Sequence, residues 1–132
     1  MTPSSLSTHG SSGPFSFGGQ VRISELQQIF CVNTASLIQE INKRGFACTF
    51  GEAFRTEEQA KWNEEKGIGI KNSLHCNRLA VDLNLFKDGV YCTGGEDWKQ
   101  FGEYWLSLHP LNRWGGNFKN RDFNHLEMQE GP

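Results

Sequence analysis

The sequence lacks paired cysteines, long apolar runs and an excess of either charge. Its four cysteines stand far apart, in no CxxC pair and no compact framework, so we expect reduced thiols and no redox or disulfide site. No stretch approaches the roughly 20 apolar residues that a membrane span needs. Because 13 basic and 15 acidic residues are mixed along the chain, no basic stripe indicates nucleic acid as a partner.

The amino-terminal segment also lacks a secretion signal, which would combine a charged start, an apolar run and a small-residue cleavage site. Residues 1–20 are rich in Ser and Gly and show no apolar periodicity, which predicts a flexible leader or in part an expression remnant. His9 in this leader is discounted as a ligand. We expect a protein that is cytoplasmic as synthesised.

The chain does contain enough large apolar residues for one hydrophobic core. Its 132 residues are close to the commonest domain size, so residues 21–132 are predicted to form a single domain. Hydrophobic residues make up 36% of the sequence and aromatics 12%, which is sufficient to close a core without covalent support. A monomer is the default expectation.

Apolar periodicity predicts two helices that pack on a core. Between residues 24 and 44 apolar side chains recur on one helical face, but Asn33 and Thr34 interrupt it. Both are good cap residues, so this segment is either one helix or two short ones. Aromatic residues at helical spacing predict another helix over 96–108, which Pro110 follows as a stop signal.

The remaining patterns predict a small sheet. Residues 46–50 and 79–86 have the composition of strands, and 87–89 form a hairpin turn into 90–92. A polar helix is expected from about 56 to 67, and the Gly- and Asn-rich stretch near the carboxyl end is expected to be a loop running into a short last strand. We therefore predict an α+β domain with a small antiparallel sheet and flanking helices.

Two histidines stand near acidic residues at informative spacing: His75 with Asp82, and His125 with Asp122. A catalytic zinc takes three nitrogen or oxygen ligands from protein and keeps a fourth position for water, and His75, Asp82 and His125 supply such a set. Asp122 is then the candidate base that removes a proton from water. Isolated residues of these types are also common as surface or hydrogen-bonding groups, so spacing alone leaves both interpretations open.

Three motifs resemble one enzyme family. SLHCNRLAVD at 73–82 resembles the SxHxxGxAxD signature of zinc D-Ala-D-Ala peptidases and of the related L-alanyl-D-glutamate endopeptidases used as phage endolysins. DFNHLE at 122–127 resembles the family's (D/E)xxHxE element, and FRTEEQ at 54–59 its arginine-bearing segment. The three motifs occur in the family's order and span residues from about 46 to 128, so the resemblance implies a Hedgehog/DD-peptidase-like zinc peptidase fold.

The resemblance implies a role for each matching residue. His75, Asp82 and His125 would bind one catalytic Zn²⁺, Asp122 would be the general base, and Arg55 would steady the carbonyl oxygen as it gains charge. A guanidinium suits that task because it is permanently charged and offers fixed donors.

Other residues have two interpretations each. Arg55 would otherwise form a surface salt bridge with Glu57 or Glu58. Ser73 either contacts substrate or holds its loop in place. Trp114, followed by two glycines, either shapes a substrate groove or belongs to a tight turn.

Glu127 follows His125 by two residues, so on a strand both side chains face the same side. There the carboxylate either orients the histidine as a second layer of ligation or is a solvated strand-end group. Arg78 occupies the signature's glycine position, so we expect no left-handed backbone there. Cys76, beside a proposed ligand, is expected to be buried and inert.

The function implied is hydrolysis of amide bonds in the stem peptide of bacterial peptidoglycan. An endolysin-like endopeptidase of the L-alanyl-D-glutamate type is favoured, acting after release to the wall. A D-alanyl-D-alanine carboxypeptidase is the nearest alternative, and a non-catalytic protein that binds zinc or wall peptide is another. No nucleic acid or membrane insertion is expected.

Overall fold

The computed structural model describes residues 22–67 and 74–131. The predicted leader and Ser73 lie outside the described residues. Within them, no helix has both the length and the apolar character needed to span a membrane.

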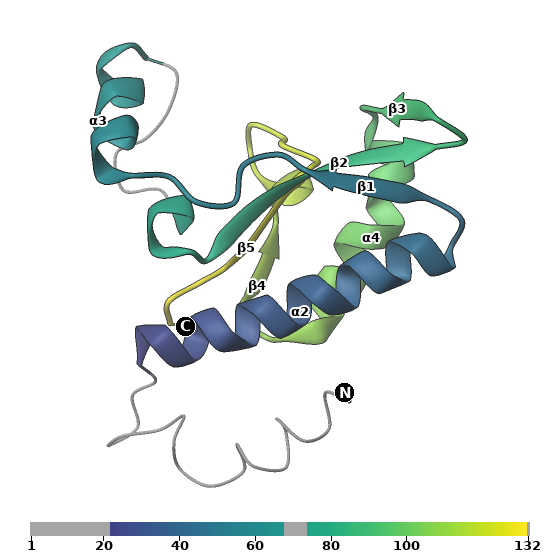
Figure 1. Cartoon of the computed structure of the whole chain (residues 1–132), viewed down its shortest axis with the longest axis horizontal. Coiled ribbons are helices and arrows are strands. Elements are labelled where there is room, and N and C mark those ends of the chain that lie inside the picture. Colours follow the sequence, from purple (N-terminus) through teal and green to yellow (C-terminus); the bar gives the residue numbers. More distant parts are fainter. Residues whose placement is uncertain (1–21, 68–73, 132) are drawn as a thin grey trace, which may run out of the picture.

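The segment with two possible helices forms one. Helix α2 (Ile23–Lys43) runs through Asn33 and Thr34 without a break. The Thr34 hydroxyl donates to the Phe30 carbonyl oxygen at 2.8 Å, so it bonds within the helix and caps no new one. Its buried face packs on the sheet beside α4 (Figure 1).

Among the described residues, helices α4 and α3 differ in how much of their surface the core buries. Helix α4 (Gly95–Leu108) buries three aromatic rings at 0–1% exposure, Trp98, Phe101 and Trp105, as its spacing predicted. Helix α3 (Glu57–Glu65) begins at the predicted cap, Thr56. It buries only Ala60 and lies away from the sheet (Figure 1), so it is a surface helix.

The sheet has five strands, which are antiparallel wherever they pair. They are β1 (Ala47–Phe50), β2 (Ala80–Lys87), β3 (Val90–Cys92), β4 (Asn112–Trp114) and β5 (His125–Met128). The order is β1-β2-β5-β4, with β3 also paired to β2. The predicted α+β class is confirmed, but β4 was expected to be loop.

The pleat of β2 separates the core from the other face of the sheet. Val81, Leu83 and Leu85 are 0–2% exposed and belong to the core cluster with residues of α2 and α4. Because side chains alternate along a strand, Asp82 projects from the opposite face. The hydrophobic core therefore fixes which way this carboxylate points.

Two local predictions are wrong. Arg78 has a φ of +56°, so its backbone is left-handed although the residue is not glycine. It follows the 3₁₀ turn η2 (Leu74–Asn77), and its guanidinium lies 4.1 Å from the centre of the Phe54 ring. That stacking offsets part of the roughly 1–2 kcal/mol that a left-handed conformation costs. Cys76 is only half-buried, with its sulfur 3.8 Å from the Thr56 carbonyl oxygen.

Candidate metal centre

Asp82 is placed by backbone pairing on both sides. On one side it stands opposite His125 in the β2–β5 register. On the other, its carbonyl oxygen accepts from the Gly51 amide and its amide donates to the Glu52 carbonyl oxygen, each at 2.7 Å. These contacts hold Asp82 between the segment that follows β1 and the start of β5.

The three predicted ligands lie together. Their donor atoms are all within 4.8 Å of one another. Oδ1 of Asp82 is 3.4 Å from Nε2 of His75 and 3.0 Å from Nδ1 of His125. Ligand atoms about 2.0–2.1 Å from one tetrahedral zinc would be about 3.3 Å apart, so the spacing fits a single ion. The set contains two imidazoles, one carboxylate and no thiolate, which suits a catalytic zinc with an open position.

Glu127 and Arg113 hold the ring of His125. Nε2 of His125 lies 2.7 Å from Oε1 of Glu127, and Oε2 of Glu127 accepts from Nε and Nη2 of Arg113 at 2.8 and 2.5 Å. The two residues of this ion pair stand opposite each other in the β4–β5 register. A carboxylate that accepts from Nε2 leaves Nδ1 as the ligand atom, which is the nitrogen that faces Asp82.

The same contacts shift the pKa values of the metal-free cluster. Burial would raise the pKa of Asp82, but hydrogen bonds and charge from His125 and His75 lower it to about 2. Burial would lower the pKa of His125, but Asp82 and Glu127 raise it to about 9. The metal-free site therefore holds His125 protonated at neutral pH, so zinc must displace a proton to bind.

The stability of the metal-free protein should therefore fall as pH rises from about 6.5 to 9. A histidine with a raised folded pKa stabilises fully below its unfolded pKa of about 6.5, and this is lost as pH rises through about 9. We expect a loss of about 1–3 kcal/mol in the free energy of unfolding, measured by urea denaturation with chelator present. The matched control is His125→Gln. If the free energy of unfolding changed with pH equally in wild type and in His125→Gln, the prediction would be wrong.

A tight turn brings Asp122 to the site. The Asp122 amide donates to the Gly115 carbonyl oxygen at 2.9 Å, and the His125 amide donates to the Asp122 carbonyl oxygen at 3.1 Å. A Cβ on Gly115 would clash with that Asp122 oxygen and lie 2.9 Å from Cβ of His125. The absent side chain therefore lets the turn that carries both residues approach η3 (Gly115–Asn117).

Gly115→Ala should accordingly weaken both folding and zinc binding. Because the clash is with backbone, the turn from Asp122 to His125 must shift, and overpacking of this kind costs about 1–3 kcal/mol. We expect lower melting temperature and weaker zinc binding in a chelator competition. Gly94→Ala is the control, because nothing lies within 4 Å of a Cβ there. Equal zinc affinity in both variants would show that the close approach of Gly115 to the Asp122–His125 turn does not position His125.

Asp122 has the properties of a reactive carboxylate. Its side chain is exposed and borders a hollow of about 240 Å³ whose other lining residues include Tyr91, Thr93 and Asn124. Burial of part of the carboxyl and the negative charge of Asp82 raise its pKa above the ordinary value. A carboxylate with a raised pKa is a better proton acceptor near neutral pH.

Arg55 lies at the edge of the cluster. Its amide donates to the His75 carbonyl oxygen at 3.2 Å, and its guanidinium pairs with Glu52 and not with Glu57 or Glu58. The Glu52 carboxylate is itself 3.7 Å from Nε2 of His75. Sequence reasoning missed Glu52 because an acid three residues before an arginine, outside any helix or strand, carries no periodic signal.

Two other predicted residues remain predictions as ligand contacts. Trp114 is 6% exposed, and its indole nitrogen donates to the Phe123 carbonyl oxygen at 2.7 Å. Packing accounts for this side chain without a ligand. Ser73 lies outside the described residues. Arg113, which no motif indicated, becomes recognisable only through the β4–β5 register.

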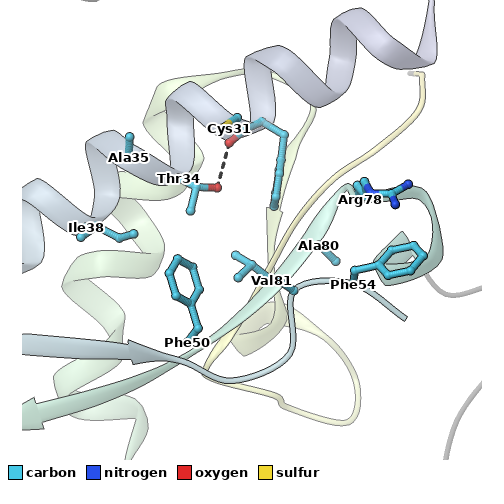
Figure 2. Close-up of a pocket in the computed structure, with 11 residues that line it drawn as sticks. Cys31, Thr34, Ala35, Ile38, Phe50, Phe54, Arg78, Ala80 and Val81 are labelled. Atoms are coloured by element: carbon cyan, nitrogen blue, oxygen red, sulfur yellow. Dashed lines mark hydrogen bonds between the residues drawn. The ribbon is translucent and has the colours of Figure 1, made fainter. Parts of the chain in front are cut away.

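A larger hollow lies on the other face of the sheet. Figure 2 shows it between α2 and the β1–β2 edge, where Ile38, Phe50 and Val81 face one another. Its volume is about 500 Å³, and Arg78 is the one charged residue in its lining. It contains no carboxylate or imidazole, so the acid-base chemistry belongs to the cluster around Asp82.

Two solved structures with a similar fold are peptidases. The L-Ala D-Glu endopeptidase ChiX of Serratia marcescens aligns with a TM-score of 0.62 and 17% identity, over 82% of this chain and 86% of that one. A variant of the vancomycin resistance D,D-pentapeptidase VanY, in complex with Zn(II), aligns with a TM-score of 0.53 and 16% identity, over 89% and 81%. At these identities the likeness establishes the fold, and it confirms the predicted zinc peptidase fold. No protein-family model and no curated protein sequence matches the chain.

Proposed function

We propose that this protein is a zinc-dependent peptidase that hydrolyses amide bonds in the stem peptide of bacterial peptidoglycan. The observation that carries the proposal is the convergence of donor atoms of His75, Asp82 and His125 within 4.8 Å, with the carbonyl oxygen of Asp122 accepting a hydrogen bond from the His125 amide. The names of the two similar structures, an L-Ala D-Glu endopeptidase and a D,D-pentapeptidase, support the substrate class. Within it we favour a phage or prophage endolysin that is an endopeptidase of the L-alanyl-D-glutamate type.

The residues present fit one zinc ion. His75 would donate Nε2, His125 would donate Nδ1 and Asp82 a carboxylate oxygen, and three protein ligands leave a position for water. A purely structural zinc would more often be enclosed by four ligands rich in cysteine. When bound, the ion would polarise an amide carbonyl and lower the pKa of water.

The chain's own residues would perform the proton transfers and hold charge. Asp122 accepts the proton of the attacking water and returns it to the leaving amine. Arg55 donates to the carbonyl oxygen as that oxygen becomes negative. Glu127, held by Arg113, keeps the His125 ring oriented, so that its second nitrogen is available to the metal.

We also propose that residues 21–132 act as one monomeric domain that is cytoplasmic as synthesised and reaches the wall after release.

Digestion of purified peptidoglycan with mass spectrometry of the fragments tests the proposed function. Zinc-loaded protein should release peptides whose masses place the cut between L-alanine and D-glutamate, and chelator should stop the release. Loss of terminal D-alanine alone would make the protein a D-alanyl-D-alanine carboxypeptidase, the nearest alternative. No cleavage of any wall source by fully loaded protein would sink the peptidase proposal and leave a binding role.

A further inference from the structure

Glu52, two residues before the arginine-bearing motif at 54–59, is anchored to the metal site through its backbone. The Glu52 carbonyl oxygen accepts from the Asp82 amide at 2.7 Å, and its neighbour Gly51 donates to the Asp82 carbonyl oxygen at the same distance. A Cβ at Gly51 would lie only 3.0 Å from that oxygen. Glu52 therefore has a defined position beside a proposed metal ligand, although it belongs to no helix or strand.

Its side chain joins two parts of the site. The Glu52 carboxylate accepts from Nη2 of Arg55, and the same oxygen, Oε1, is 3.7 Å from Nε2 of His75. This His75 nitrogen is the one that faces Asp82 at 3.4 Å. The Arg55 side chain is 14% exposed and that of Glu52 34% exposed, so the pair is partly shielded from solvent. The guanidinium is thus fixed at the border of the cluster.

We propose that Glu52 is the positioning residue for Arg55, an inference that rests on the proposed function. An unrestrained arginine side chain populates many rotamers. Fixing it in one rotamer during the reaction would cost conformational entropy, which would offset much of the free energy gained from its hydrogen bond to the carbonyl oxygen. A donor held beforehand toward the developing negative charge avoids that loss. The Glu52 charge also balances the guanidinium, which would otherwise place an unpaired positive charge next to a divalent cation.

Three variants assayed at saturating zinc test this: Glu52→Ala, Arg55→Ala and the double variant. If Glu52 acts through Arg55, Glu52→Ala lowers kcat about 10- to 100-fold with KM changed less than about 3-fold, and the double variant is no slower than Arg55→Ala. Glu57→Ala, which removes an exposed acid two residues after Arg55, is the control and should keep wild-type rates. If the fold-reduction in kcat of the double variant equalled the product of the two single reductions, Glu52 would act independently of Arg55 and the inference would be wrong.

A second readout does not depend on activity. In the metal-free wild type, the Arg55 side-chain Nε–H signal in NMR should be distinct and slow to exchange, because the guanidinium is held in a partly buried ion pair. Glu52→Ala should bring it to the exchange rate of a free arginine, whereas Glu57→Ala should leave it unchanged. An unaltered signal in Glu52→Ala would refute positioning even if the wild type cleaves wall. A wild type that cleaves nothing while Glu52→Ala frees Arg55 would refute the proposed function alone.

Discussion

Asp82→Asn is expected to lower zinc affinity by more than about 100-fold. Loss of a residue that only hydrogen-bonds to a metal ligand typically lowers affinity by about 10- to 100-fold, and Asp82 is proposed to bind the metal directly. Asp82 is the one anion among the three clustered donors, and its Oδ1 faces both histidines. Asn keeps the shape of the side chain but is a neutral and weaker zinc ligand. The change therefore removes the negative charge while strand β2 stays intact. Competition with a fluorescent chelator measures the effect.

Asp88→Asn is the matched control for that experiment. Asp88 lies in the β2–β3 turn with a φ of +51°, a conformation that Asn tolerates well. The control removes the same charge from the other end of the hairpin and should bind zinc as wild type does. Equal affinities for the two variants would mean that the metal, if bound, is held elsewhere.

Asp122→Asn is expected to lower kcat about 10²- to 10⁴-fold while zinc stays bound, because it removes the group that accepts the proton from water. The neutral amide cannot act as a base, but the backbone bonds of Asp122 to Gly115 and His125 remain possible. Steady-state rates on wall peptides and zinc content measured on the same samples separate chemistry from metal loss.

Asp88→Asn again provides the comparison for Asp122→Asn, since it is an equal change of charge away from the cluster. Full activity in Asp122→Asn would show that another group takes the proton. Loss of zinc together with activity would instead show that Asp122 belongs to the ligand set.

Local patterns were sufficient to predict the two strands that carry Asp82 and His125. Alternation along β2 placed Asp82 on the face opposite Leu83, and spacing on β5 placed Glu127 on the same side as His125. Both follow from the two-residue period of a strand, which depends on nothing beyond the strand itself. The helix over 96–108 was equally visible, because its apolar period extends over several turns, whereas the segment at 24–44 was predicted as either one helix or two.

What could not be predicted depends on contacts between segments far apart in the chain. Strand β4 has only three residues and is followed by two glycines, so it is too short to give a periodic signal in the sequence. Its register with β5 nevertheless places Arg113 opposite Glu127. Glu52 reaches the cluster only because its backbone pairs with Asp82. The left-handed backbone of Arg78 was missed because a bulky residue there is unusual and its stacking on Phe54 is not visible in the sequence.

The most direct test of the central claim is a zinc titration of metal-free protein, with hydrolysis of a wall stem peptide as the readout. One site built from His75, Asp82 and His125 predicts that the rate rises linearly with added zinc and stops rising at one equivalent. Hydrolysis that persists without metal, or none at one bound equivalent, would contradict the account.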